Sequence, residues 1–374
     1  MIGARAGLPS LIAIVLGLAG MIVGFLAMAG IVPAIYIGAL PVGGGLVVAG
    51  VLLVGVTIAR ALVAGWPLAL PGRFVAAGLC FLLLTVGLGF CFALALAWPQ
   101  IFPWGSLVGR GLPLHVASGL VGWFTLTAVG VSYRLLSMFM LAPEDDSGIG
   151  PWVLYLAAAG LAFLWLDTFL GDVSIIGFIW KGGMFLLIVA AVLYLVDMVR
   201  MFGARRRPVL ELNSKAGATA LVALAVCVVG LAAVEVTGRW ESLIGPLCYL
   251  LLFGWLSGLA LGQLYKIIPF LTWLERYGPR LGKMAVPRVQ DLVKERRASR
   301  WFILYFLAVA AGTISGAFDQ ITLWRAAIFL HLVASLFITR ELWRSRHLRY
   351  LASANATKTA SRAPALSHPT RLSP

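Results

Sequence analysis

Residues 9–31, PSLIAIVLGLAGMIVGFLAMAGI, contain no charged side chain and are long enough to cross a lipid bilayer as one helix. Similar apolar stretches recur along the chain, which is 61% hydrophobic and 11% charged over 374 residues. This composition excludes a water-soluble domain. Because lipid cannot hydrogen-bond to the backbone, only helices or closed barrels can span it, and these stretches are too long for barrel strands. The sequence predicts an all-α transmembrane bundle of about ten spans within residues 1–349.

Charged residues, Pro and Gly bound the predicted spans. The first apolar stretch has no clear small-residue cleavage site, so we expect it to remain as the first span and not to act as a signal peptide. We place the spans near residues 9–31, 35–60, 74–97, 114–139, 150–170, 174–199, 216–237, 244–271, 301–318 and 323–340.

Lys and Arg collect in alternate connections between these spans, and the opposite connections hold little beyond Arg110 and Arg239. The positive-inside rule then predicts that both termini face the cytoplasm, in the inner membrane of a bacterium. The basic loop 276–300 could lie on anionic headgroups or only fix this topology. The segment 350–374 is rich in Ala, Ser, Thr and Pro, which predicts a disordered cytoplasmic tail. Because the net charge of +15 is concentrated in the connections predicted to be cytoplasmic, we expect the lipid bilayer and not nucleic acid as a partner.

Two spans resemble each other without gaps. The fourth contains GWFTLTAVGVSYRLLSMF (Gly122–Phe139) and the eighth contains GWLSGLALGQLYKIIPFL (Gly254–Leu271). Both are predicted to run from outside to inside, so the match indicates a parallel four-helix repeat, with copies centred on 115–139 and 247–271. Chance similarity is the alternative, and close helix packing and interfacial anchoring could also explain these residue types. The matched pairs are Gly122/Gly254, Trp123/Trp255, Ala128/Ala260, Gly130/Gly262, Tyr133/Tyr265 and Arg134/Lys266.

Ionisable side chains inside a span are energetically costly and therefore candidate functional residues. The predicted outer half holds five of them, one on each of five spans. Lys181 could pair with Glu235 or Asp167, either as a structural ion pair or as part of a polar pathway. Asp197 lies near the inner edge, where we expect it to face the headgroups. The five outer residues are His115, Asp167, Lys181, Glu235 and His331.

His115 shares one helix face with Gly119 and Gly122. Small residues below a histidine allow either a flat macrocycle or another helix to approach closely. An imidazole is a common axial ligand of haem iron, so His115 is a candidate ligand. His331 could be a second ligand or a buried hydrogen-bonded residue. The spans hold too few histidines for a copper site, so we expect no copper.

His115 followed by GLVGWFTLTAVGVSYRLLSMF resembles the haem-copper oxidase catalytic-subunit superfamily, in its divergent branch that includes nitric-oxide-response haem membrane proteins. The resemblance implies repeated four-helix units and a haem held by histidine near the outer end of a helix. It also implies a possible oxidoreductase in respiratory electron transfer or nitric-oxide handling, with respiratory-complex subunits as possible partners. The chain departs from this pattern because Ala117 replaces the second histidine of the family's His-x-His and Leu247 stands where the repeat would place a second copy of His115. We therefore expect no oxygen-reducing haem-copper centre.

Two other functions remain open. A transporter or permease would use the repeat together with Lys181, Asp167 and Glu235 as its polar pathway. A non-catalytic partner of a respiratory complex would need neither cofactor nor pathway. Other enzyme classes have no support, since the sequence lacks P-loop, GxSxG and HExxH motifs and its four cysteines have no metal-binding spacing.

Overall fold

A computed structural model describes residues 4–143, 148–170, 176–283 and 285–349. Every regular element in these ranges is helical, and ten helical stretches there are long and apolar enough to cross a membrane. The predicted polytopic helical bundle is therefore confirmed. The predicted tail 350–374 lies outside the described residues.

Eight of the spans are single α-helices, and the fourth and eighth are each built from an α-helix, a π-helical segment and a second α-helix. Short 3-10 turns, η1, η4 and η5, occupy connections. The elements are α1 Ala4–Met28, η1 Ala34–Gly38, α2 Ala39–Ala64, α3 Leu70–Ala97, α4 Gly105–Ala117, η2 Ser118–Thr125, α5 Leu126–Met140, α6 Ile149–Leu170, α7 Ile176–Gly203, α8 Leu212–Thr237, α9 Trp240–Tyr249, η3 Leu250–Ser257, α10 Gly258–Tyr277, η4 Gly278–Arg280, η5 Val289–Leu292, α11 Glu295–Ala317 and α12 Ile321–Arg346.

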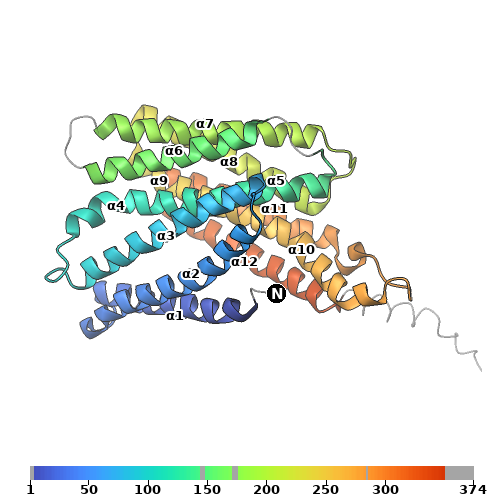
Figure 1. The fold of residues 1–374 in the computed structure, drawn as a ribbon, viewed down its shortest axis with the longest axis horizontal. Helices are drawn as coiled ribbons and strands as arrows, with labels where there is room; N and C mark the ends of the chain where they lie inside the picture. Colours follow the sequence, from blue (N-terminus) through green and yellow to red (C-terminus); the bar gives the residue numbers. More distant parts are fainter. Residues whose placement is uncertain (1–3, 144–147, 171–175, 284, 350–374) are drawn as a thin grey trace, which may run out of the picture. The chain divides into compact units, whose positions relative to one another are not determined.

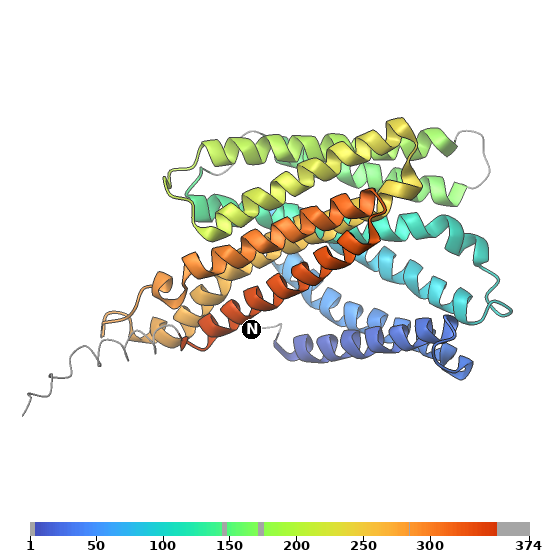
Figure 2. The same cartoon turned by 180° about the vertical axis from the view of Figure 1, so that it is seen from behind.

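The helices form two compact units. Unit 1 comprises Met1–Val209 and Ala225–Trp240, and unit 2 comprises Leu210–Leu224 and Glu241–Pro374, so that α8 is divided between them. Within unit 1, α6 lies beside α7, and within unit 2, α11 lies beside α12 (Figures 1 and 2). Each unit is described below by itself.

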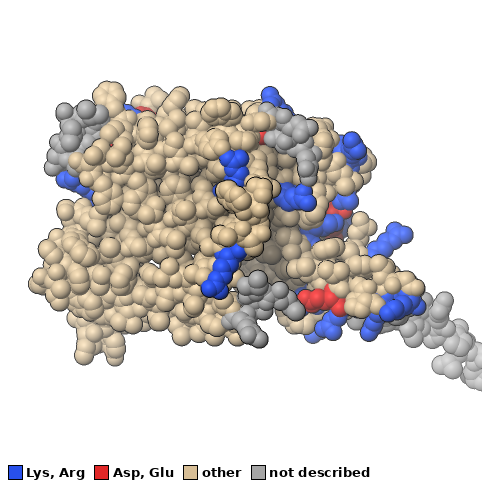
Figure 3. Space-filling model, viewed as in Figure 1, with Lys and Arg blue, Asp and Glu red and all other residues tan. Residues whose placement is uncertain are grey.

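Large apolar side chains cover much of the exterior. Phe178 is 81% exposed, Val236 87% and Val199 72%. Large parts of the face drawn in Figure 3 carry no charged side chain. An apolar surface of this extent is stable only against lipid, because water would not solvate it favourably.

Most helices extend beyond the predicted spans, and three cases illustrate this. The fourth span begins at Gly105 instead of residue 114, α12 continues to Arg346, and α11 begins at Glu295, inside the predicted basic loop 276–300. Hydropathy marks only the apolar part of a helix. Arg and Glu have high helix propensity, so a helix continues through charged residues at the headgroup level.

The two π-helical segments occupy matching positions of the sequence repeat. Gly122 is the fifth residue of η2, and Gly254 is the fifth residue of η3. A proline precedes each segment, Pro113 in α4 and Pro246 in α9. Proline removes a backbone hydrogen-bond donor from the helix, and a π-helical turn is one way to accommodate such an irregularity in the pattern of backbone hydrogen bonds. Such turns are often found near functional sites.

Two glycines of the motif make close helix contacts in unit 1. A Cβ at Gly122 would lie 2.7 Å from Phe81 Cβ in α3 and 3.3 Å from Leu161 Cδ1 in α6. A Cβ at Gly130 would lie 2.4 Å from Phe74 Cβ, also in α3. The absence of a side chain at both positions lets α3 pack directly on this span.

The matched glycines make equivalent contacts in unit 2. A Cβ at Gly254 would lie 2.8 Å from Ala223 Cβ in α8 and 3.5 Å from Val309 Cγ1 in α11. A Cβ at Gly262 would lie 2.9 Å from Ala216 Cβ in α8. In each unit, therefore, the same two glycines contact the preceding span, and the first of them also contacts the following span.

Candidate functional site

His115 lies in α4, one turn before η2, and its ring packs on α3. A Cβ at Gly89 would lie 2.7 Å from His115 Cε1, and the Phe92 ring centroid is 5.6 Å from that of His115. The imidazole is half-buried and also faces the Thr85 backbone. Its Nδ1 atom is buried without a hydrogen-bond partner among the described residues. This histidine therefore has one buried ring nitrogen without a protein partner among the described residues.

Gly119 and Gly122 were predicted to admit either a macrocycle or a helix. The space at Gly122 is filled by Phe81 and Leu161, so helix packing explains this glycine. A Cβ at Gly119 would meet only the Thr85 methyl group, at 3.4 Å. Of the two glycines, Gly119 is the one where the helix surface near His115 has more room.

His331, in α12, is 8% exposed and is enclosed by aromatic rings. Its ring centroid lies 4.8 Å from those of Phe253 and Tyr305 and 5.9 Å from that of Tyr249. Its Nδ1 is hydrogen-bonded to Tyr249 Oη at 3.1 Å, and Tyr305 Oη donates to the Phe253 carbonyl oxygen at 2.8 Å. These contacts favour the second predicted role of His331, a buried hydrogen-bonded residue. Only Nε2 would be left to bind a metal.

Asp167, Lys181 and Glu235 come from α6, α7 and the second half of α8, all within unit 1. Lys181 is close enough to Glu235 for their charges to attract, and the Trp180 backbone, next to Lys181, hydrogen-bonds to Asp167. Asp167 Oδ1 and Glu235 Oε1 are buried without a hydrogen-bond partner among the described residues. Of the predicted polar pathway, Lys181 and Glu235 therefore lie near each other, and Asp167 belongs to the same unit.

Asp197 was predicted to face the headgroups, and this was wrong. It is 3% exposed and accepts a hydrogen bond of 2.9 Å from Tyr133 Oη. Beside this pair, Ser132 Oγ and Tyr194 Oη are 2.7 Å apart. Tyr133 is therefore a buried partner of an acidic residue and not an anchor at the lipid surface, because a buried carboxylate needs hydrogen-bond donors.

The matching tyrosine of unit 2, Tyr265, is equally buried, and its hydroxyl has no hydrogen-bond partner among the described residues. Lys266, the counterpart of Arg134, forms an ion pair with Glu211. Helix α12 of this unit carries a buried acid, Glu341, as α7 of unit 1 carries Asp197. Glu341 is 1% exposed and forms an ion pair with Arg297 at 2.9 Å. Of the motif tryptophans, Trp255 is fully buried and Trp123 is half-buried.

Sequence reasoning missed several polar residues of unit 2. Asn213 and Gln263 are both buried, and none of their side-chain amide atoms has a hydrogen-bond partner among the described residues. Gln263 could have been found as a polar residue in the middle of an apolar span. Asn213 follows a charged connection, and nothing in the sequence separates it from ordinary interfacial residues.

Within the described ranges, no group of three or more His, Cys, Asp and Glu side chains is arranged to hold a metal ion. A haem needs only one or two such ligands, so this finding does not bear on His115. Comparisons with protein-family models, with curated proteins and with solved structures found no match to this chain.

Proposed function

We propose that this chain is a multi-pass haem-binding membrane protein that uses His115 as an axial ligand. The observation that carries the proposal is the buried Nδ1 of His115, which has no hydrogen-bond partner among the described residues. A buried polar atom normally has a partner, and an imidazole nitrogen without one is suited to bind a metal. Haem, when bound, would supply one-electron redox chemistry or a binding position for a diatomic gas.

The residues around His115 fit this role. The ring packs against Phe92 and the bare backbone of Gly89, both in α3, and Nδ1 has no hydrogen-bond partner among the described residues. The helix surface one turn below, at Gly119, is open except for the Thr85 methyl group. An apolar and partly buried setting of this kind favours a neutral imidazole, the form that binds iron.

The resemblance to the haem-copper oxidase superfamily gains support from the two four-helix groups. The first consists of α3, α4–α5, α6 and α7, and the second of α8, α9–α10, α11 and α12. Matching π-helical segments and equivalent glycine contacts are what a duplication would leave behind. We propose that the chain contains such a repeat and that its function lies in electron transfer or nitric-oxide handling.

The remaining parts of the proposal follow from charge and composition. Both termini would face the cytoplasm of a bacterium, and subunits of a respiratory complex are candidate partners. We propose no copper centre. The chain would then be an oxidoreductase only if the haem itself exchanges electrons with a partner or a gas.

An absorption spectrum tests this function. Protein purified in detergent after haem-replete expression should show a Soret band, which His115→Ala should remove. The matched variant His331→Ala should keep the band, because His331 is engaged with Tyr249. A stable wild-type protein without a Soret band would contradict the proposal, and so would a band that His115→Ala leaves unchanged.

A second candidate function, transport, rests on the polar pathway of unit 1. Glu235 lies near Lys181 and has a buried oxygen without a hydrogen-bond partner among the described residues, which makes it a candidate acceptor for a proton or a small cation. Asp167, in the same unit, also has such an oxygen. In liposomes, Lys181→Met and Glu235→Gln should then reduce proton or cation flux relative to the exposed control Glu275→Gln. Equal flux in all four proteins would remove this assignment.

A further inference from the structure

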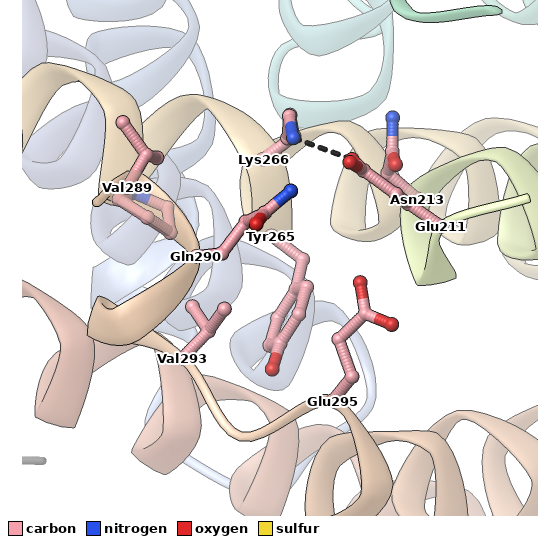
Figure 4. A pocket seen from close by; sticks show the side chains of 9 residues that line it. Glu211, Asn213, Tyr265, Lys266, Val289, Gln290, Val293 and Glu295 are labelled. Atoms are coloured by element: carbon pink, nitrogen blue, oxygen red, sulfur yellow. Dashed lines mark hydrogen bonds and ion pairs between the residues drawn. The ribbon is translucent and has the colours of Figure 1, made fainter. Parts of the chain in front are cut away.

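A cavity of about 270 Å³ lies within unit 2, and none of the residues used above for haem or transport lines it. Its wall is formed by the beginning of α8, the middle of α10, the turn η5 and the beginning of α11 (Figure 4). The beginnings of α8 and α11 and the turn η5 belong to the side of the chain predicted to face the cytoplasm. Its lining residues are Glu211, Asn213, Tyr265, Lys266, Pro269, Val289, Gln290, Val293 and Glu295.

Two buried polar side chains line this cavity without a hydrogen-bond partner among the described residues. Asn213 is 2% exposed, and neither its amide nitrogen nor its amide oxygen is paired. Tyr265 is 5% exposed, and its hydroxyl is likewise unpaired. Since buried polar groups in folded proteins are almost always hydrogen-bonded, these three atoms indicate a polar occupant of the cavity.

The charges around the cavity select the kind of occupant. Lys266 is already paired with Glu211, as the dashed line in Figure 4 shows. Glu295 accepts one long hydrogen bond, 3.3 Å, from the Leu212 amide, and a carboxylate can accept several more. Its carboxylate points toward the side of the cavity where Glu211 and Asn213 lie (Figure 4). Two acids against one lysine leave a negative lining, which favours a cation.

We propose that this cavity binds a small organic ammonium ligand that also carries a hydroxyl or similar polar group. The ammonium would donate to the Glu295 carboxylate and to the Tyr265 hydroxyl oxygen. The hydroxyl would both donate to and accept from the Asn213 amide. A metal ion fits less well, because the described residues offer no cluster of three or more metal-binding side chains here.

Such a ligand has two possible sources, a soluble amino alcohol or the ethanolamine headgroup of a lipid. The beginnings of α8 and α11, which line the cavity, adjoin connections predicted to lie at the cytoplasmic surface, where lipid headgroups are found. The probe for both is ethanolamine, which is small enough for the cavity. Two molecules of similar size serve as controls, the anion glycolate and neutral ethylene glycol.

The full chain, in nanodiscs of phosphatidylcholine and phosphatidylglycerol, is titrated with ethanolamine while its thermal unfolding is followed by tryptophan fluorescence. A ligand that binds only the folded state raises the unfolding temperature in a saturable manner. We expect this rise with ethanolamine and not with glycolate or ethylene glycol. No saturable rise, or an equal rise with ethylene glycol, would show that the cavity does not select an ammonium group, and the proposal would be overturned.

Variants assign the binding to this cavity. Glu295→Gln should raise the apparent Kd about tenfold or more, since it removes a charge-assisted hydrogen bond. Tyr265→Phe should raise it about threefold to tenfold through loss of one hydroxyl. Glu241→Gln, in the first turn of α9 outside the cavity lining, should leave it unchanged. If either cavity variant folds and binds ethanolamine as the wild type does, the assignment is refuted.

A second lipid mixture distinguishes the sources. With phosphatidylethanolamine in the nanodiscs, a smaller response to soluble ethanolamine would show that the lipid headgroup occupies the cavity. An unchanged response would identify the ligand as a soluble amine. Both results support the ammonium site and differ only in where its ligand comes from.

Discussion

Adding one methyl group at Gly130 should loosen the contact between α3 and α5. A Cβ at this position would lie 2.4 Å from Phe74 Cβ and 3.1 Å from the Pro71 carbonyl oxygen. Ordinary carbon contacts begin near 3.4 Å, so the two helices would have to separate by about 1 Å. Overpacking of this kind costs about 1–3 kcal/mol, against a gain of about 0.5–1 kcal/mol for replacing glycine by alanine in a helix. We expect Gly130→Ala to lower the free energy of unfolding by about 1–2 kcal/mol.

Gly87→Ala is the matched control. Gly87 lies in the middle of α3, and a Cβ there would have no neighbour within 4 Å. Only the helix-propensity gain remains, so this variant should be as stable as the wild type or more stable. Reversible unfolding in mixed micelles, followed by tryptophan fluorescence, measures both. If Gly130→Ala is stabilised as Gly87→Ala is, the close approach of α3 and α5 is refuted.

Three further results are expected in the same unfolding assay. Gly262→Ala should destabilise the protein less than Gly130→Ala, because its Cβ would lie 2.9 Å from Ala216 Cβ, compared with 2.4 Å between a Gly130 Cβ and Phe74 Cβ. A larger effect of Gly262→Ala would contradict the packing described for unit 2. Tyr133→Phe should lower the free energy of unfolding by about 1.5–3 kcal/mol, since it removes a hydrogen-bond donor to buried Asp197. Tyr265→Phe should change the free energy of unfolding by no more than about 0.5 kcal/mol, because the Tyr265 hydroxyl has no hydrogen-bond partner among the described residues. Equal losses in the two variants would contradict this difference between the two hydroxyl groups. Glu341→Gln, which removes the charge of a buried carboxylate paired with Arg297, should lower the free energy of unfolding by about 3 kcal/mol. Glu275→Gln, in an exposed pair with Arg346, should lower it by at most about 1 kcal/mol. The reverse order would refute the burial of Glu341.

The spans could be predicted from sequence because hydropathy reports directly on the solvent that a helix faces. Helix ends were less predictable. Charged residues such as Glu295 and Arg346 continue a helix once its apolar part is anchored, and no change in composition marks the last turn. The π-helical segments were not predicted, since their sequences are as apolar as those of ordinary helices.

The candidate site was predictable only one residue at a time. The cost of charge in a membrane singled out Asp167, Lys181 and Glu235, and the structure places all three in unit 1, with Glu235 near Lys181. Sequence position failed for Asp197, because depth along a helix does not reveal which side of the helix faces its neighbours. The cavity around Asn213 and Glu295 joins residues from distant parts of the chain, and a single sequence contains no signal for such a contact.

The haem content of the purified protein tests the central claim most directly. Haem extracted as its pyridine complex, divided by the protein concentration, should give about one haem per chain for the wild type and for His331→Ala. His115→Ala should fall to near zero while remaining folded. A folded wild-type protein without haem, or a His115→Ala variant with the wild-type ratio, would contradict the account.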